Sequence, residues 1–305
     1  MTHPDHRTHP LALIHHAAGR GHDHPSNSLA ALETCLDAGA AVVEIDLVPL
    51  GDGSLALLHD QDLAADTNGK GLAPRMTRAQ VAELFYTKED TPTEHQVGFL
   101  EDAVALLRDY PDTRRLQLDF KPYTPLTRPM IEGLLGLIEP VRDRIQVTSV
   151  ADWALRALAA ASPALSLGFD PLLYLDLVED QPRPENIPPF RVGAYGLLDD
   201  HPLAAFQWGS LADYFAARAE SLLLLAPPSC QWFIRAELLK MSRNAGFDWI
   251  GYLHQHDALV DGWTINPNQP GQVSLAQDLA EAGIDALTTD DPVLLASALQ
   301  VETVY

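Results

Sequence analysis

The stretch Val42-Val43-Glu44-Ile45-Asp46-Leu47 decides the fold, because it sets two carboxylates into an otherwise apolar run. A β-strand projects residues i and i+2 to the same face, so Glu44 and Asp46 point the same way, ~6–7 Å apart along the chain. Carboxylates in such a place are costly to bury unless they are paired or bind a cation. The strand therefore meets a metal ion, a basic partner or water at its carboxylate face.

Other apolar runs of the chain also end in side chains that can move protons or bind cations. One run is followed by His15 and another by His59, and histidine titrates near neutral pH, which suits it to proton transfer. A third run ends with Asp119 and Lys121 on one face, an oxygen ligand beside a cation. A cap, a loop or a salt bridge explains each of them alone. Together they converge on one site if their strands form a barrel.

Short apolar runs alternate with helical patterns along most of the chain, as they do in βα units around a parallel sheet. The chain has 305 residues, 47% of them hydrophobic, which is the size of one barrel, so we expect the α/β class and a (β/α)8 TIM barrel. The expected strands are residues 11–14, 42–47, 116–120, 145–147, 165–169, 222–225, 262–265 and 286–288. The expected helices are residues 28–38, 78–84, 100–110, 127–139, 152–161, 203–220 and 231–244.

The chain is expected to form a single barrel domain over residues 11–305, preceded by a flexible, histidine-rich leader at residues 1–10. A small excursion, about residues 60–98, follows the second strand. The Pro/Thr/Glu-rich stretch that precedes the helix 100–110 is expected as a loop. Residues 171–189, rich in proline and acidic residues, are expected as a long surface connection.

The composition excludes several classes of partner. The chain carries 42 Asp+Glu against 20 Lys+Arg, a formal charge of -22, so its field repels nucleic acids and anionic lipid surfaces. An anionic substrate would need a local cation, which a bound metal can provide. The chain has no apolar run of about 18 residues and no signal-like leader, so we expect a cytoplasmic protein without membrane insertion. The sequence leaves the oligomeric state open.

Several short motifs occur in the order and spacing of a known family. The chain resembles the glycerophosphodiester phosphodiesterases over about residues 11–298, as a divergent member. The motifs are Pro25-Ser26-Asn27-Ser28, Ala38-Gly39-Ala40, Glu44-Ile45-Asp46, Asp52-Gly53, His59-Asp60, Thr67-Asn68-Gly69-Lys70-Gly71, Leu118-Asp119-Phe120-Lys121, Gly262-Trp263-Thr264-Ile265-Asn266 and Gly283-Ile284-Asp285-Ala286 followed by Thr289-Asp290.

The resemblance implies a function and a set of roles. It implies a TIM-type barrel with an excursion after the second strand and metal-dependent hydrolysis of a small or lipid-derived phosphodiester. The cofactor would be one divalent cation, Mg²⁺ or Ca²⁺, with Mn²⁺ as a further option. By position, the roles are general acid and base for His15 and His59, metal ligands for Glu44, Asp46 and Asp119, a phosphate-binding cation for Lys121 and an apolar substrate wall for Trp263.

The chain departs from the family pattern at its first loop. The family has His-Arg-Gly where this chain has His15-His16-Ala17, so the phosphate-binding arginine is missing and Arg20 is the candidate substitute. His16 is expected to contact the phosphate, or to replace His15 if the motif is shifted by one residue. The usual glutamate after Pro25 is Ser26. These changes leave two alternatives open: a phospholipase-D-like or cyclising lyase on the same scaffold, and a catalytically weakened barrel that binds an anionic ligand.

Overall fold

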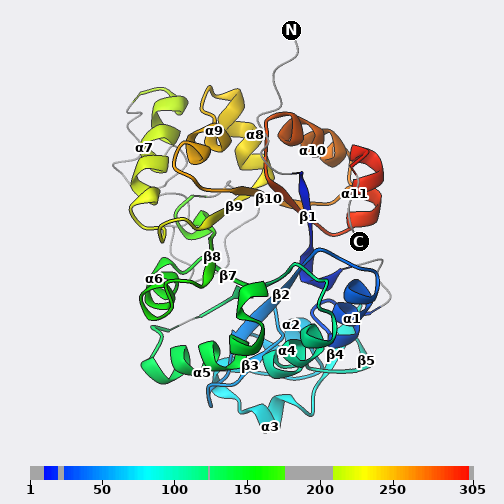
Figure 1. Cartoon of the computed structure of the whole chain (residues 1–305). Helices are drawn as coiled ribbons and strands as arrows, with labels where there is room; N and C mark the ends of the chain where they lie inside the picture. The colour runs from blue at the N-terminus through cyan, green and yellow to red at the C-terminus, as the bar shows by residue number, and fades with distance from the viewer. Residues whose placement is uncertain (1–9, 20–23, 123, 176–208, 302–305) are drawn as a thin grey trace.

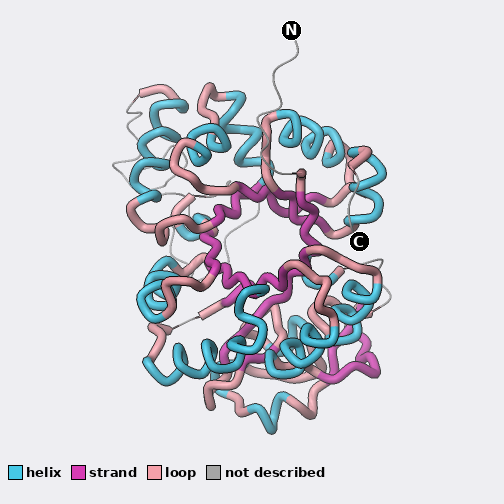
Figure 2. Tube along the Cα trace, in the orientation of Figure 1, coloured by secondary structure: helices cyan, strands magenta, loops and turns pink. Residues whose placement is uncertain are grey.

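Eight parallel strands close into a barrel in this computed structural model, which describes residues 10–19, 24–122, 124–175 and 209–301. Helices surround the strands on the outside (Figures 1 and 2). The closing contact pairs the first barrel strand with the last one, with His15 beside Thr289, and also with the second, with His15 beside Val43. In the order of neighbours around the barrel, the strands are β1 (Ala12–His15), β2 (Val42–Pro49), β6 (Arg115–Phe120), β7 (Ile145–Ser149), β8 (Ser166–Phe169), β9 (Gln231–Arg235), β10 (Val260–Ile265) and β11 (Ala286–Thr289).

The first helix shows how the sequence sets the helix boundaries. The Ser28 hydroxyl accepts a hydrogen bond from the Ala31 N–H, which caps the helix start. Leu32 and Leu36 are buried against the barrel, and Gly39 takes a positive φ of 75° just past the end. The helices of the barrel are α1 (Leu29–Asp37), α4 (Leu100–Asp109), α5 (Arg128–Ile138), α6 (Asp152–Ala161), α7 (Leu211–Leu223), α8 (Ala236–Asn244), α9 (Trp249–His254), α10 (Gln272–Glu281) and α11 (Pro292–Leu299), with 3-10 turns at His16–Ala18, Glu139–Arg144 and Pro171–Leu173.

The excursion after the second strand has a small apolar core of its own. Leu58, Leu63, Val81 and Phe99 are among the buried residues of this second cluster, which lies apart from the main core around the barrel. Within the described residues, no helix is long and apolar enough to cross a membrane. The elements of the excursion are β3 (Leu55–Ala56), α2 (Leu63–Asp66), a 3-10 turn (Ala73–Arg75), α3 (Arg78–Val81), β4 (Phe85–Lys88) and β5 (Thr91–Gln96).

The expectation of a loop before helix α4 was wrong, because β4 and β5 form an antiparallel hairpin there. The hairpin turns at Glu89 and Asp90, which both adopt positive φ values, 50° and 61°. Two-residue hairpin turns of this kind usually carry asparagine, aspartate or glycine. A Glu-Asp pair gives only a weak signal of this turn, and β5 is largely exposed, so it lacks the apolar alternation of a buried strand.

The sixth strand was also placed wrongly. Residues 222–225 were expected as a strand, but Leu222 belongs to helix α7, where it lies on the same buried face as Phe215 and Ala219. The actual strand is β9, which was taken for the start of a helix at residue 231. Because β9 is only five residues long, its apolar run could not be separated from a helical turn by pattern alone.

Parts of three expectations lie outside the described residues. These parts are nearly all of the leader at 1–10, most of the connection expected at 171–189, and the first residues of the helix expected at 203–220. The other expected strands and helices of the barrel were confirmed, with bounds that shift by one or a few residues.

Tyr86 ties the excursion to the barrel. Its buried hydroxyl lies 2.8 Å from the Leu57 carbonyl oxygen and 3.1 Å from the Asn27 carbonyl oxygen, and it accepts a hydrogen bond from the Gly98 N–H at 3.2 Å. We predict that Tyr86→Phe lowers the free energy of unfolding by about 1–3 kcal/mol, because it leaves buried backbone groups unpaired.

Urea denaturation of the wild type and the variant measures this difference. The matched control is Tyr110→Phe, which removes an exposed hydrogen bond of 2.6 Å to Asp37. We expect the control to lose less than Tyr86→Phe. Equal losses in the two variants would contradict a linking role for Tyr86.

Candidate functional site

Three carboxylates meet where β2 and β6 lie side by side. The register of the two parallel strands sets Asp46 directly beside Asp119, while Glu44 lies two residues before Asp46 on the same face. One oxygen of each carboxylate lies within 4.8 Å of the others. Glu44 and Asp46 are buried, with 3% and 2% of their surface exposed. The three groups that the sequence predicted as metal ligands therefore form one cluster.

Lys121 neutralises part of this cluster. Its Nζ lies 2.8 Å from Asp46 Oδ1 and 3.0 Å from Asp119 Oδ2. Burial works against ionisation of Asp46. The ammonium of Lys121, the nearby His59 and the hydrogen bonds from Lys121 and Asn27 together still hold the pKa of Asp46 below its ordinary value. Burial raises the pKa of Asp119 despite the same ammonium.

Glu44 has the chemistry of a cation ligand. Its Oε2 accepts a hydrogen bond from the Ala17 N–H at 2.7 Å, whereas its Oε1 is buried and has no hydrogen-bond partner within the part of the chain that the structure describes. Burial, together with the negative charge of Asp46, raises the pKa of Glu44 to about 8. A buried carboxylate oxygen without a donor, next to two further carboxylates, fits a hard divalent cation.

Asn27 is a site residue that the sequence reasoning missed. Its Nδ2 donates to Asp46 Oδ2 at 2.8 Å, and its Oδ1 accepts from the Asp46 N–H at 2.9 Å. The two bonds fix the backbone and the carboxylate of Asp46 together. The motif Pro25-Ser26-Asn27-Ser28 contained this signal, since the asparagine stands just before the cap of α1 with a positive φ of 61°.

The structure brings His16, and not His15, to the cluster. His15 is buried, with 2% of its surface exposed, and it lines neither of the two lobes described below. The side chain of His16 is 34% exposed and lines both lobes, and its Nδ1 lies 2.8 Å from Asp290 Oδ1. Side chains alternate along a strand, and Ile14 packs with Phe233, which lines the carboxylate lobe, so His16 faces the same side as Ile14.

The carboxylates around His16 raise the pKa of its imidazole. Burial would lower the pKa of His16, but the hydrogen bond to Asp290 and the charges of Glu44 and Asp46 raise it to about 9. Asp290 is a second residue that the sequence reasoning did not single out. Its role was hidden because 274 positions separate it from His16, and the closure of the barrel brings the two together.

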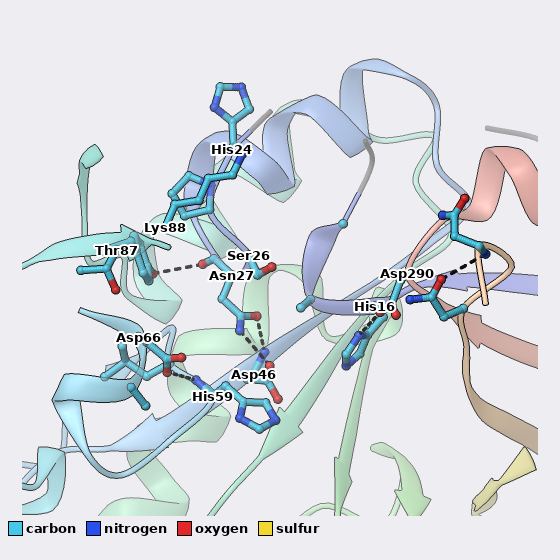
Figure 3. Close-up of a pocket in the computed structure, with 18 residues that line it drawn as sticks. His16, His24, Ser26, Asn27, Asp46, His59, Asp66, Thr87, Lys88 and Asp290 are labelled. Carbon is cyan, nitrogen blue, oxygen red and sulfur yellow. Dashed lines mark hydrogen bonds and ion pairs between the residues drawn. The ribbon is translucent and has the colours of Figure 1, made fainter. Parts of the chain in front are cut away.

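His59 reaches the same cavity from the excursion. Its side chain is 52% exposed, and its Nδ1 lies 3.1 Å from Asp60 Oδ2. The Asp66 carboxylate accepts hydrogen bonds from the backbone N–H groups of both His59 and Asp60, at 2.9 and 3.0 Å. Asp66 of α2 thus anchors the loop that carries His59. The imidazole of His59 faces Asp46 and the cavity (Figure 3).

The cavity has two lobes that share His16, Asp46 and His59. The carboxylate lobe, about 280 Å³, contains Glu44, Asp119 and Lys121. The hairpin lobe, about 450 Å³, lies toward β4 of the hairpin and the loop around Asn27 (Figure 3).

The remaining predicted residues are placed as follows. Trp263 lines the carboxylate lobe, as expected of a substrate wall, and the guanidinium of Arg235 lies 5.0 Å from the centre of its ring. Lys121 lies in the same lobe. Arg20, the candidate substitute for the family's arginine, lies outside the described residues.

Comparisons with known proteins agree with this geometry. The model of the glycerophosphoryl diester phosphodiesterase family matches residues 18–166. A probable glycerophosphodiester phosphodiesterase 1 of Mycobacterium tuberculosis is 27% identical over 265 residues, which is 81% of this chain and 90% of that protein.

Solved structures share the fold. A putative glycerophosphoryl diester phosphodiesterase from Silicibacter pomeroyi superposes with a TM-score of 0.64 and 18% identity, covering 98% of this chain and 94% of that one. A phosphodiesterase from Oleispira antarctica, in complex with the product sn-glycerol-3-phosphate, has a TM-score of 0.62 and 20% identity, covering 95% and 97%. The family model and the curated relatives therefore support membership of the glycerophosphoryl diester phosphodiesterase family, and the solved structures agree in fold.

Proposed function

We propose that the protein hydrolyses a glycerophosphodiester, or a related small or lipid-derived phosphodiester, with one divalent cation and two histidines. The observation that carries this proposal is the convergence of three carboxylates and two imidazoles on one cavity. The relatives support it, since they are named as glycerophosphodiester phosphodiesterases, and one structural neighbour holds sn-glycerol-3-phosphate. A cytoplasmic location stays a prediction.

Glu44, Asp46 and Asp119 would hold the cation. All three offer carboxylate oxygens, which Mg²⁺ and Ca²⁺ prefer, and Mn²⁺ is a further option. When bound, such an ion neutralises the phosphate and stabilises the negative charge that develops during the reaction. Lys121, in the same lobe, supplies a second positive charge to the phosphate.

His16 is the stronger candidate for the general acid. Its contact with Asp290 fixes Nδ1, so its Nε2 carries the proton that goes to the leaving alcohol oxygen as the phosphorus–oxygen bond breaks. A cation that neutralises Glu44 and Asp46 removes two of the causes that raise the pKa of His16 and brings it closer to neutral, where proton donation is most efficient.

His59 is the candidate general base. Its Nδ1 contacts Asp60, which leaves Nε2 to take a proton from the water that attacks phosphorus. One proton is taken and one is given, so the pair returns to its starting protonation after proton exchange with solvent. The structure thus favours His16 with His59 over the pair His15 and His59 that the sequence suggested.

The first test is hydrolysis of bis(p-nitrophenyl) phosphate and glycerophosphocholine with Mg²⁺, Ca²⁺, Mn²⁺ or EDTA. We expect EDTA to abolish turnover, and His16→Gln and His59→Gln to lower kcat by about 10²- to 10⁴-fold. His15→Gln is expected to keep most of the activity of its folded fraction, measured by circular dichroism.

Three outcomes of this test would change the proposal. If His15→Gln loses activity and His16→Gln keeps it, the original assignment of His15 stands. Folded protein without turnover favours the barrel that only binds an anionic ligand. A cyclic phosphate product in ³¹P NMR favours the cyclising lyase.

A second test concerns protons released on metal binding. Because the pKa of Glu44 is about 8 without a metal, most Glu44 side chains are protonated at pH 7, and a bound cation displaces that proton. We predict release of close to one proton per ion and an affinity that rises ~tenfold per pH unit up to the pKa. Calorimetry in two buffers of different ionisation enthalpy measures the proton release. Glu44→Gln should release much less than the wild type, because only the fall in the pKa of His16 then contributes. A wild-type heat that does not depend on the buffer would refute the prediction.

A third test addresses Asp290. Asp290→Asn keeps the shape of the side chain and removes its charge, so the imidazolium of His16 loses a stabilising partner and its pKa falls by roughly one unit. We predict that the basic limb of the kcat/KM profile moves to lower pH and that kcat falls about tenfold. NMR titration of the His16 ring in metal-free protein checks the shift directly. An unchanged profile would show that Asp290 does not act through His16.

A further inference from the structure

The hairpin lobe is a polar site beside the reacting groups. At about 450 Å³ it has the size of a small-molecule site by itself. Apart from the shared residues, most of its wall is polar. This wall comes from the loop after the 3-10 turn at His16–Ala18, from the excursion and from the loop after β10. The polar side chains on these walls are His24, Ser26, Asn27, Asp66, Thr87, Lys88, Asn266 and Asn268.

One wall of this lobe carries a lysine and a histidine. Lys88 and His24 both line it, and in Figure 3 they lie on one side of the lobe while His16 and Asp290 lie on the other. His24 is held in place by His95, with His24 Nδ1 3.2 Å from His95 Nε2. In a chain with a formal charge of -22, a wall with a lysine and a histidine pair is a local exception.

The acidic groups of the lobe are already engaged. Asp290 contacts His16, Asp46 contacts Lys121, and Asp66 accepts two backbone N–H groups at 2.9 and 3.0 Å. These contacts compensate their charge locally, so the acidic side of the lobe attracts a cationic ligand less than the number of carboxylates suggests.

We propose that the hairpin lobe binds the alcohol portion of the diester and prefers a hydroxyl-rich, uncharged or anionic headgroup to a quaternary ammonium. This proposal rests on the proposed function, because the phosphate must lie between His16 and His59, which both lobes share. An alcohol on that phosphate then extends into the hairpin lobe. Serine, threonine and asparagine side chains there match hydroxyl groups as donors and acceptors.

The lining also disfavours choline for a second reason. Quaternary ammonium groups are usually recognised by the faces of aromatic rings. Tyr86 is the one Phe, Tyr or Trp among the described residues that line this lobe, and it is 2% exposed with its hydroxyl held by backbone groups. The ammonium of Lys88, on the wall of the lobe, would repel the trimethylammonium group.

The test uses phosphomonoesters, which report headgroup binding without turnover. Isothermal titration calorimetry compares inositol 1-phosphate with phosphocholine on metal-loaded wild type, Lys88→Glu and Lys70→Glu. Lys70 is an exposed lysine of the same excursion that lines neither lobe, so its variant changes the net charge equally. We expect the wild type to bind inositol 1-phosphate at least about fivefold more tightly than phosphocholine. Lys88→Glu should reduce this ratio of affinities about threefold, as for an exposed charge, and Lys70→Glu should leave it unchanged.

Two results would overturn the proposal: a wild-type ratio of one or less, including no binding of either ester, or a ratio that Lys88→Glu does not change more than Lys70→Glu does. Hydrolysis of bis(p-nitrophenyl) phosphate by the same three proteins separates this from the proposed function. Turnover with a ratio of one removes only the headgroup preference. A ratio of five without turnover removes the hydrolase function and keeps the headgroup site.

Discussion

The mutual repulsion of three carboxylates, brought within 4.8 Å of one another in a largely buried place, is the constraint on which the site depends. Like charges at such distances cannot all persist out of water without compensation. The chain compensates them from three directions: Lys121 bridges Asp46 and Asp119, Asn27 holds Asp46 from the loop before α1, and the Ala17 N–H holds Glu44 from the turn after β1. The first loop, β2 and β6 are therefore fixed relative to one another by the chemistry of the cluster as well as by the barrel.

This constraint explains why much of the site could be predicted from the sequence. Glu44 and Asp46 share a face because strands have a period of two, and this follows from the local sequence alone. Asp119 joins them because β2 and β6 are neighbours in parallel register, which the alternation of strands and helices implies for a barrel. Both strands carry buried apolar residues on the face opposite to these carboxylates, so their position was clear from the pattern.

The parts that could not be predicted depend on single-residue geometry or on distant contacts. Whether His15 or His16 enters the cavity depends on which face of β1 lines the barrel interior. The sequence does not show this, because Leu13 and Ile14 lie on opposite faces and are both apolar and buried. The contact of His16 with Asp290 requires the barrel to close across nearly the whole chain. The β4–β5 hairpin turns through Glu89 and Asp90, which give little sign of a turn. The leucines at 222–225 include the last buried residue of helix α7, Leu222, and its exposed C-cap, Leu224, so an apolar run there was mistaken for a strand.

The charges of the cluster also support the proposed divalent cation, because one lysine does not balance three carboxylates. The carboxylates of Glu44, Asp46 and Asp119 and the ammonium of Lys121 carry a formal charge of three negatives and one positive, which leaves −2. Without a metal, the protein lowers this charge by protonating Glu44, whose pKa burial raises to about 8. A divalent cation at the proposed site would bring the same set to zero with every carboxylate ionised. A phosphodiester anion would then approach a neutral cluster beside the His16 imidazolium, which favours its binding in a chain whose overall charge is −22.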